Sequence, residues 1–254
     1  MIHLFRRWFS RGQPPSGQIP SELWSAMFDQ IPFLRGLTTT EQARLYELSN
    51  AFLATKEMHG AAGLALTDAM RAAIAVQACL PILELGLSCY DDWVGVIVYP
   101  TEFRVQREEI DDAGVMHEWD EHIAGESMHG GPVVISWEDA TTDQLGYSVV
   151  IHEFAHKLDG LDGELNGVPP LPPGIPADDW RTLWQTHFDD FVALVEEDED
   201  TAPFDPYAAT HPAEFFPVMS EAFFTDPEQL NAVYPDLYDA MRAFYRQDPL
   251  ARLG

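Results

Sequence analysis

The chain has 254 residues, of which 46% are hydrophobic and 12% aromatic, so it has enough apolar material for a packed core. Its 42 acidic residues against 14 basic ones give a formal charge of −28, which repels nucleic-acid phosphates and anionic lipid headgroups. This composition excludes disorder over most of the chain and direct binding to nucleic acid. No run of about 18 apolar residues occurs, so no membrane span is predicted.

The first 19 residues are predicted to form a flexible leader. Basic and aromatic side chains alternate up to Arg11, and the proline-rich stretch 13–17 follows without the apolar core of a secretory signal. Cys79 and Cys89 are the only cysteines, too few for a disulfide framework. Both observations predict a cytoplasmic protein.

Three helices are predicted in the first third of the chain. A short helix is expected at 20–31, and the pair Thr38 and Glu41 has the spacing of a capping box that opens a second. The third covers 68–85, where Pro81 marks a kink or an end.

Strands are predicted where the composition changes. The β-branched run 94–99 is bounded by Pro100, and 131–137 repeats the pattern between turn residues. The polar and acidic segment 111–130 between them is predicted to be a loop, holding one short strand at most.

The most informative stretch is the apolar run 149–158, which contains His-Glu-x-x-His at His152, Glu153 and His156. Residues four apart lie on the same face of an α-helix, so the two imidazoles can bind one metal ion. The glutamate beside the first histidine can then reach a water molecule on that metal. The pattern therefore predicts a helix that carries a zinc site and the general base of a hydrolase.

The remaining segments alternate connection and helix. Four prolines make 165–174 a surface connection. Apolar side chains at helical spacing predict a helix at 180–197, which ends in an acidic run, and another at 213–225 after Pro212.

A zinc site with an open position for catalysis needs a third protein ligand. No further histidine follows closely on His156, which leaves a carboxylate on another helix. Glu214 and Glu221 lie seven residues apart, two helical turns, and can share a face. Spacing alone leaves both open.

Three segments resemble the Mlc titration factor A family of bacterial proteins. They are IHEFAHKLD at 151–159, DPYAATHPAEFF at 205–216 and FYRQDP at 244–249, in the same order as in the family. The resemblance extends from about Leu37 to Pro249.

The resemblance implies a zinc peptidase of the gluzincin kind, related in its catalytic core to anthrax lethal factor. The fold expected is α+β: a predominantly helical, zincin-like metallopeptidase with a small mixed sheet and an active-site helix. Residues 20–254 would form one domain, with a helical part at 20–93 and a catalytic core at 94–254. One zinc ion per chain is expected, and the Pro-Ala-Glu segment makes Glu214 its third protein ligand. Glu221 would then support a ligand or be an ordinary helix residue.

The family also has a histidine upstream of the second strand, which aligns here with His117. As a fourth protein ligand, His117 would leave no open position and describe a closed resting site. The alternative is an ordinary loop histidine, and both interpretations remain open.

The mechanism expected is hydrolysis of peptide or aminoacyl amide bonds, in which Glu153 takes a proton from the zinc-bound water and returns it to the leaving amine. By resemblance, the hydroxyl of Tyr207 stabilises the oxyanion; a tyrosine that only packs is the alternative. Val133–Ser136 is predicted to be an edge strand on which an extended peptide docks.

The resemblance implies two possible functions. The first is a peptidase of the aminopeptidase type, linked to the regulation of sugar uptake and acting on peptide substrates. The alternative is a regulatory binding protein that sequesters an Mlc-like transcriptional repressor, with weak or conditional peptidase activity. The acidic surface favours a basic protein partner.

Overall fold

The computed structural model describes residues 18–110, 116–127, 130–142 and 144–253, without the side chains of 104–110 and 116–122. The predicted leader therefore lies almost wholly outside the described residues. At its end Ile19 is already buried, and its carbonyl oxygen accepts a hydrogen bond of 2.9 Å from the Tyr46 hydroxyl.

The described chain is mostly helical with a small mixed sheet, as predicted. The α-helices are α2 (Ser21–Gln30), α3 (Thr39–Thr55), α4 (Asp68–Cys79), α5 (Trp137–Ala140), α6 (Val149–Asp159), α7 (Ala177–Glu197), α8 (Pro212–Thr225), α9 (Pro227–Val233) and α10 (Pro235–Tyr245). The strands are β1 (Glu57–Gly60), β2 (Gly95–Tyr99), β3 (Phe103–Ile110), β4 (Met116–Ile123), β5 (Gly125–Ser127) and β6 (Val133–Ser136). No helix in the described ranges has both the length and the hydropathy to cross a membrane.

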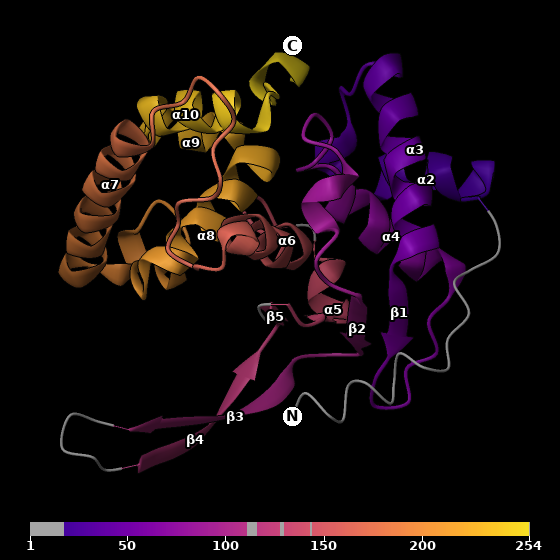
Figure 1. The fold of residues 1–254 in the computed structure, drawn as a ribbon, viewed down its shortest axis with the longest axis horizontal. Helices are drawn as coiled ribbons and strands as arrows, with labels where there is room; N and C mark the ends of the chain where they lie inside the picture. Colours follow the sequence, from indigo (N-terminus) through magenta and orange to yellow (C-terminus); the bar gives the residue numbers. More distant parts are fainter. Residues whose placement is uncertain (1–17, 111–115, 128–129, 143, 254) are drawn as a thin grey trace.

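The main sheet has the strand order β1-β2-β6-β5. The first three strands are parallel, and β5 runs antiparallel to β6 with Gly125 opposite Ile135. Strands β3 and β4 pair only with each other in the described chain and form a hairpin that extends away from the body (Figure 1).

Helix α6 lies in the centre of the molecule, between the helices of the first third and the group α7–α10 (Figure 1). It packs against α4 and α8 and touches the sheet through β5 and β6. Its apolar side chains are fully or almost fully buried, and the ring of Phe154 packs among aromatic side chains at centroid distances of 5.2–5.6 Å: Phe52, Tyr90 and Trp93. The helix is therefore fixed in the core and can hold its polar face in one position.

Several local predictions are confirmed. Thr38 and Glu41 form the capping box at the start of α3, in which each side chain binds the other's backbone N–H. Helix α4 ends at Cys79, two residues before Pro81, and Pro212 occupies the first position of α8.

Two strand predictions are wrong. The segment 111–130 contains all of β4 and all of β5, although its charged residues have low strand propensity and gave no signal. Val133–Ser136 is not an edge strand, because β6 pairs with β2 on one side and β5 on the other. Among the described strands, the edge position on this side of the sheet belongs to β5.

Strand β1 lies in a part of the chain for which only helices were predicted. It has four residues, of which only Met58 is buried, so the sequence shows no alternating pattern. Its pairing with β2 adds a strand from the first third of the chain to the sheet that the later strands form.

Candidate metal centre and active site

Helix α6 presents both histidines of the motif to one cleft. Ser148 caps its N-terminus by accepting a hydrogen bond of 3.3 Å from the backbone N–H of Ile151. The rings of His152 and His156 lie 4.9 Å apart on the same face, as the four-residue spacing predicts.

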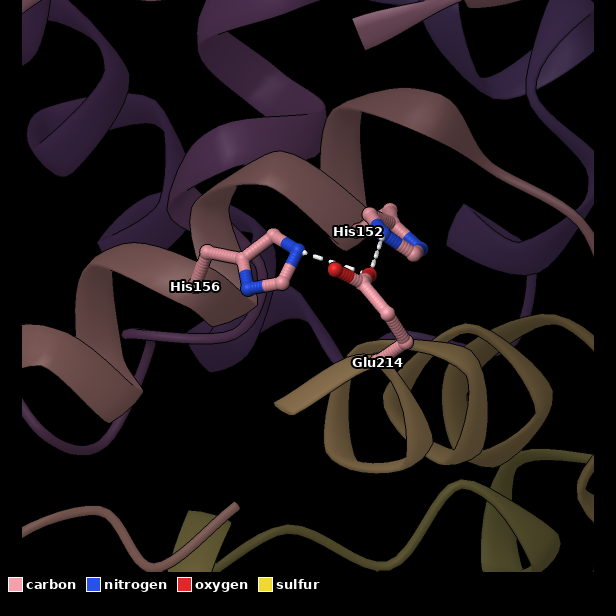
Figure 2. Close-up of side chains that lie close together, drawn as sticks. All are labelled: His152, His156 and Glu214. Carbon is pink, nitrogen blue, oxygen red and sulfur yellow. Dashed lines mark hydrogen bonds and ion pairs between the residues drawn. The ribbon is translucent and has the colours of Figure 1, made fainter. Parts of the chain in front are cut away.

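Helix α8 brings Glu214 to the two histidines (Figure 2). Its Oε2 lies 3.2 Å from Nε2 of His152 and 3.1 Å from Nε2 of His156. One ligand atom from each of the three residues lies within 4.8 Å of the others. Two imidazole nitrogens and a carboxylate oxygen are donors that suit a tetrahedral zinc site with an open position.

Glu221 lies two turns farther along α8 and contacts the ring nitrogen of His152 that does not face Glu214. Its Oε1 is 2.8 Å from Nδ1 of His152, and its Oε2 accepts a hydrogen bond from the backbone N–H of Ser148. The side chain is buried, which fixes the carboxylate. A donor at Nδ1 of His152 in this contact would let Nε2, which faces Glu214, bind a metal ion.

Glu153 is buried beside this group, and burial raises the pKa of its carboxyl group to about 8. The charges of Glu214 and Glu221 raise this pKa as well, while that of His152 opposes them. Its Oε2 has no hydrogen-bond partner among the described residues. An uncompensated buried carboxyl group next to a candidate metal site is typical of a proton acceptor in catalysis.

The electrostatics of the group fit a bound cation. Burial lowers the pKa of His152, but its hydrogen bonds with Glu214 and Glu221 outweigh this effect and hold the pKa well above its ordinary value. The same contacts with His152 and His156 hold the pKa of Glu214 well below its ordinary value, against the effect of burial. Positive charge is therefore stabilised where the three ligand atoms converge, and a metal ion can replace the protons there.

These residues line a cleft of about 450 Å³. Strand β5 forms one wall, and Tyr207, which is 45% exposed, lies with its ring 6.0 Å from that of His152. The cleft is lined by Ile123, Ala124, Gly125, Glu126, Ser127, Tyr147, Val149, His152, Glu153, His156, Leu165, Asp205, Tyr207, Glu214, Val218 and Glu221.

Asp159, the last residue of α6, holds the chain segment that follows the helix. Its buried Oδ2 accepts hydrogen bonds of 2.9 Å from the backbone N–H groups of Asn166 and Gly167. Gly167 has a φ of 76°, and a methyl group on it would lie 2.7 Å from the carbonyl oxygen of Pro212. Gly167 therefore lies close to the first turn of α8, which contains Glu214.

Sequence reasoning missed the cleft residues of β5 and the role of Asp159. No pattern could indicate a three-residue strand, whereas Asp159 could have been found, because it lies three residues after His156 on the same helix. His117 lies on β4, but its side chain is outside the described part, so its role as a ligand stays a prediction.

The sequence profile of the glucose-regulated metallo-peptidase M90 family matches residues 5–246. The chain belongs to this family. Mlc titration factor A of Pectobacterium atrosepticum is 40% identical over 240 residues, which are 91% of this chain and 88% of the relative. The proteins of that name from Yersinia pestis and Yersinia pseudotuberculosis are 36% identical over 255 residues, covering 97% of this chain and 92% of theirs.

Family membership and the fold agree. The match covers nearly the whole chain, including α6 with its two histidines and α8 with Glu214. The resemblance to the Mlc titration factor A family is therefore confirmed, and the chain is a metallopeptidase with an α+β, zincin-like fold.

Proposed function

We propose that this protein is a zinc-dependent peptidase of the aminopeptidase type, which hydrolyses peptide or aminoacyl amide bonds with Glu153 as general base. The observation that carries the proposal is the buried Glu153 carboxyl group beside the converging ligand atoms of His152, His156 and Glu214. The proposed metal is one zinc ion per chain, because imidazole and carboxylate donors in this number suit it.

Zinc bound there would act as a Lewis acid toward the scissile carbonyl group and lower the pKa of the attacking water. The chain's own residues then orient the reactants and move the proton. Glu153 accepts the proton of the attacking water on its carboxylate and passes it to the leaving nitrogen, so that one water is consumed and one acid and one amine are formed. Glu221 keeps the His152 ring in the orientation that ligation requires.

The substrate is proposed to bind as an added strand on β5. Support comes from the position of β5 at the edge of the sheet and from its three residues in the wall of the cleft. An extended peptide can hydrogen-bond with the backbone of such a strand. β5 thereby takes the role that the sequence had predicted for Val133–Ser136.

An aminopeptidase must also recognise the free α-ammonium group of its substrate. The cleft favours a cation, because the carboxylates of Glu126 and Asp205 line it in addition to those of the metal group. We expect the purified, zinc-loaded protein to hydrolyse aminoacyl anilides and short peptides with free amino termini. Acetylation of the terminus should lower kcat/KM at least about tenfold, which corresponds to the loss of roughly 1.4 kcal/mol of recognition. Equal rates on free and acetylated substrates would contradict the aminopeptidase type, and no hydrolysis of either would contradict the peptidase.

Tyr207 is proposed to donate its hydroxyl proton in a hydrogen bond to the oxyanion. It lies at the cleft beside His152, on the short turn Pro206–Ala209. The Tyr207→Phe variant keeps the ring, so we expect kcat to fall by about 10²- to 10³-fold, with KM changed only a few-fold. Steady-state kinetics on an aminoacyl anilide measures both constants. An unchanged kcat would reduce Tyr207 to a packing residue.

His117 is retained as a proposed fourth ligand. Coordination by three imidazoles and one carboxylate would close the resting site, and the segment that carries His117 would have to leave the metal before turnover. The number of imidazoles on the metal distinguishes the open site from the closed one.

A second function is proposed from the names of the relatives. Proteins called Mlc titration factor A are 36–40% identical to this chain, so an Mlc-like transcriptional repressor is a proposed partner, with a link to sugar-uptake regulation. Binding of such a repressor by the Glu153→Gln variant, measured by calorimetry, separates the two functions. Retained binding without hydrolysis would make them independent, whereas loss of both would place the partner at the active site.

A further inference from the structure

The first residue of β5, Gly125, lies directly against the Glu153 side chain. A methyl group on Gly125 would overlap Oε1 of Glu153 and would lie 2.6 Å from its Cγ and 2.7 Å from its Cδ. Side chains do not approach a Cβ atom this closely in folded proteins. The lack of a side chain at position 125 is therefore required by the present position of Glu153.

The requirement concerns space and not backbone conformation. Gly125 is not among the described glycines with a positive φ, so an alanine could adopt its backbone angles. A methyl group on Gly125 would point toward Glu153, so this position faces α6. The glycine thus leaves room for a carboxyl group at the point where the edge strand and the motif helix touch.

Neither neighbour can move away easily. Helix α6 is anchored by the fully buried Phe154, and β5 is held by its hydrogen bonds with β6. A larger residue at position 125 would therefore displace the flexible part of the contact, which is the Glu153 side chain. Glu153 lines the cleft together with Glu214 and His152, so displacement of its side chain would change the position of its carboxyl group relative to both residues.

We propose that Gly125 is a positioning residue. Because it has no side chain, Glu153 can occupy the space beside the edge strand, next to the docked substrate. This inference rests on the proposed role of Glu153. Strand β5 would then have two roles. Its backbone pairs with the peptide, and the absence of a side chain at Gly125 leaves space for the proton acceptor.

The test combines kinetics and stability of the zinc-loaded, full-length protein. We expect Gly125→Ala to lower kcat about 100-fold, because a displacement of roughly 1 Å in a reacting group costs that much. KM for an aminoacyl anilide should change only a few-fold, and the zinc content should be unchanged. Gly63→Ala is a control for a destabilising glycine substitution away from the site, since Gly63 has a φ of 83° and does not line the cleft. It should lower the melting temperature and leave kcat unchanged.

A second pair of variants tests the contact itself. In Glu153→Ala the atoms that a methyl group on Gly125 would meet are absent, so adding Gly125→Ala should leave the melting temperature unchanged, whereas it should fall in the wild-type background. Wild-type kcat in Gly125→Ala, or an equal fall in melting temperature in both backgrounds, would overturn the proposal. The stability comparison needs no catalysis, so a failure of the proposed peptidase function would be recognised separately.

Discussion

Replacement of Glu153 by glutamine is expected to lower kcat by about 10²- to 10⁴-fold, the usual contribution of a general base. Glutamine keeps the shape of the side chain beside Gly125 but cannot accept a proton. Since Glu153 is not one of the three converging ligands, the zinc content should stay at that of the wild type. Initial rates on an aminoacyl anilide at matched zinc content give the comparison.

The control for this variant is Glu138→Gln, which removes one carboxylate from an exposed position outside the cleft. It should retain wild-type kcat and KM. Full activity of Glu153→Gln would remove Glu153 from the mechanism. Loss of zinc together with activity would instead make it part of the metal site.

Removal of Glu214 is expected to have the largest effect on the metal. Glu214→Ala leaves two imidazoles as protein ligands, so we expect zinc affinity to fall by more than the roughly 10- to 100-fold that loss of an outer hydrogen-bond partner costs. Hydrolysis should disappear at limiting zinc. Competition with a chromophoric chelator measures the affinity.

Glu221→Gln provides the graded comparison on the same helix. This variant keeps a hydrogen-bond acceptor near Nδ1 of His152 but loses the charge, so its zinc affinity should lie between those of the wild type and Glu214→Ala. If Glu221→Gln bound zinc more weakly than Glu214→Ala, the roles of the two glutamates would have to be exchanged.

The local part of the site was predictable because the helix itself sets its geometry. His152, Glu153 and His156 lie within five residues, and α-helical spacing fixes which of them share a face. Glu214 was different, since 58 residues separate it from His156. Spacing could show that Glu214 and Glu221 share a face, but only the family resemblance separated them.

The strand side of the cleft could not be predicted in the same way. β5 has three residues, Gly-Glu-Ser, with no apolar alternation, and its place in the sheet depends on pairing with β6. Missing β5 made Val133–Ser136 look like the edge. It also hid the contact between Gly125 and Glu153, because no property of the sequence reports that a glycine faces a side chain 28 residues away on another element.

X-ray absorption spectroscopy at the zinc edge of the zinc-loaded protein reports directly on the metal ligands His152, His156 and Glu214. We expect imidazole nitrogens at about 2.0–2.1 Å and carboxylate or water oxygens at about 2.0–2.2 Å, with one oxygen donor lost in Glu214→Ala. Two imidazoles would describe the open site and three would add His117. Fewer than two imidazoles, a sulfur donor at about 2.3 Å, or a spectrum unchanged in Glu214→Ala would contradict the site formed by His152, His156 and Glu214.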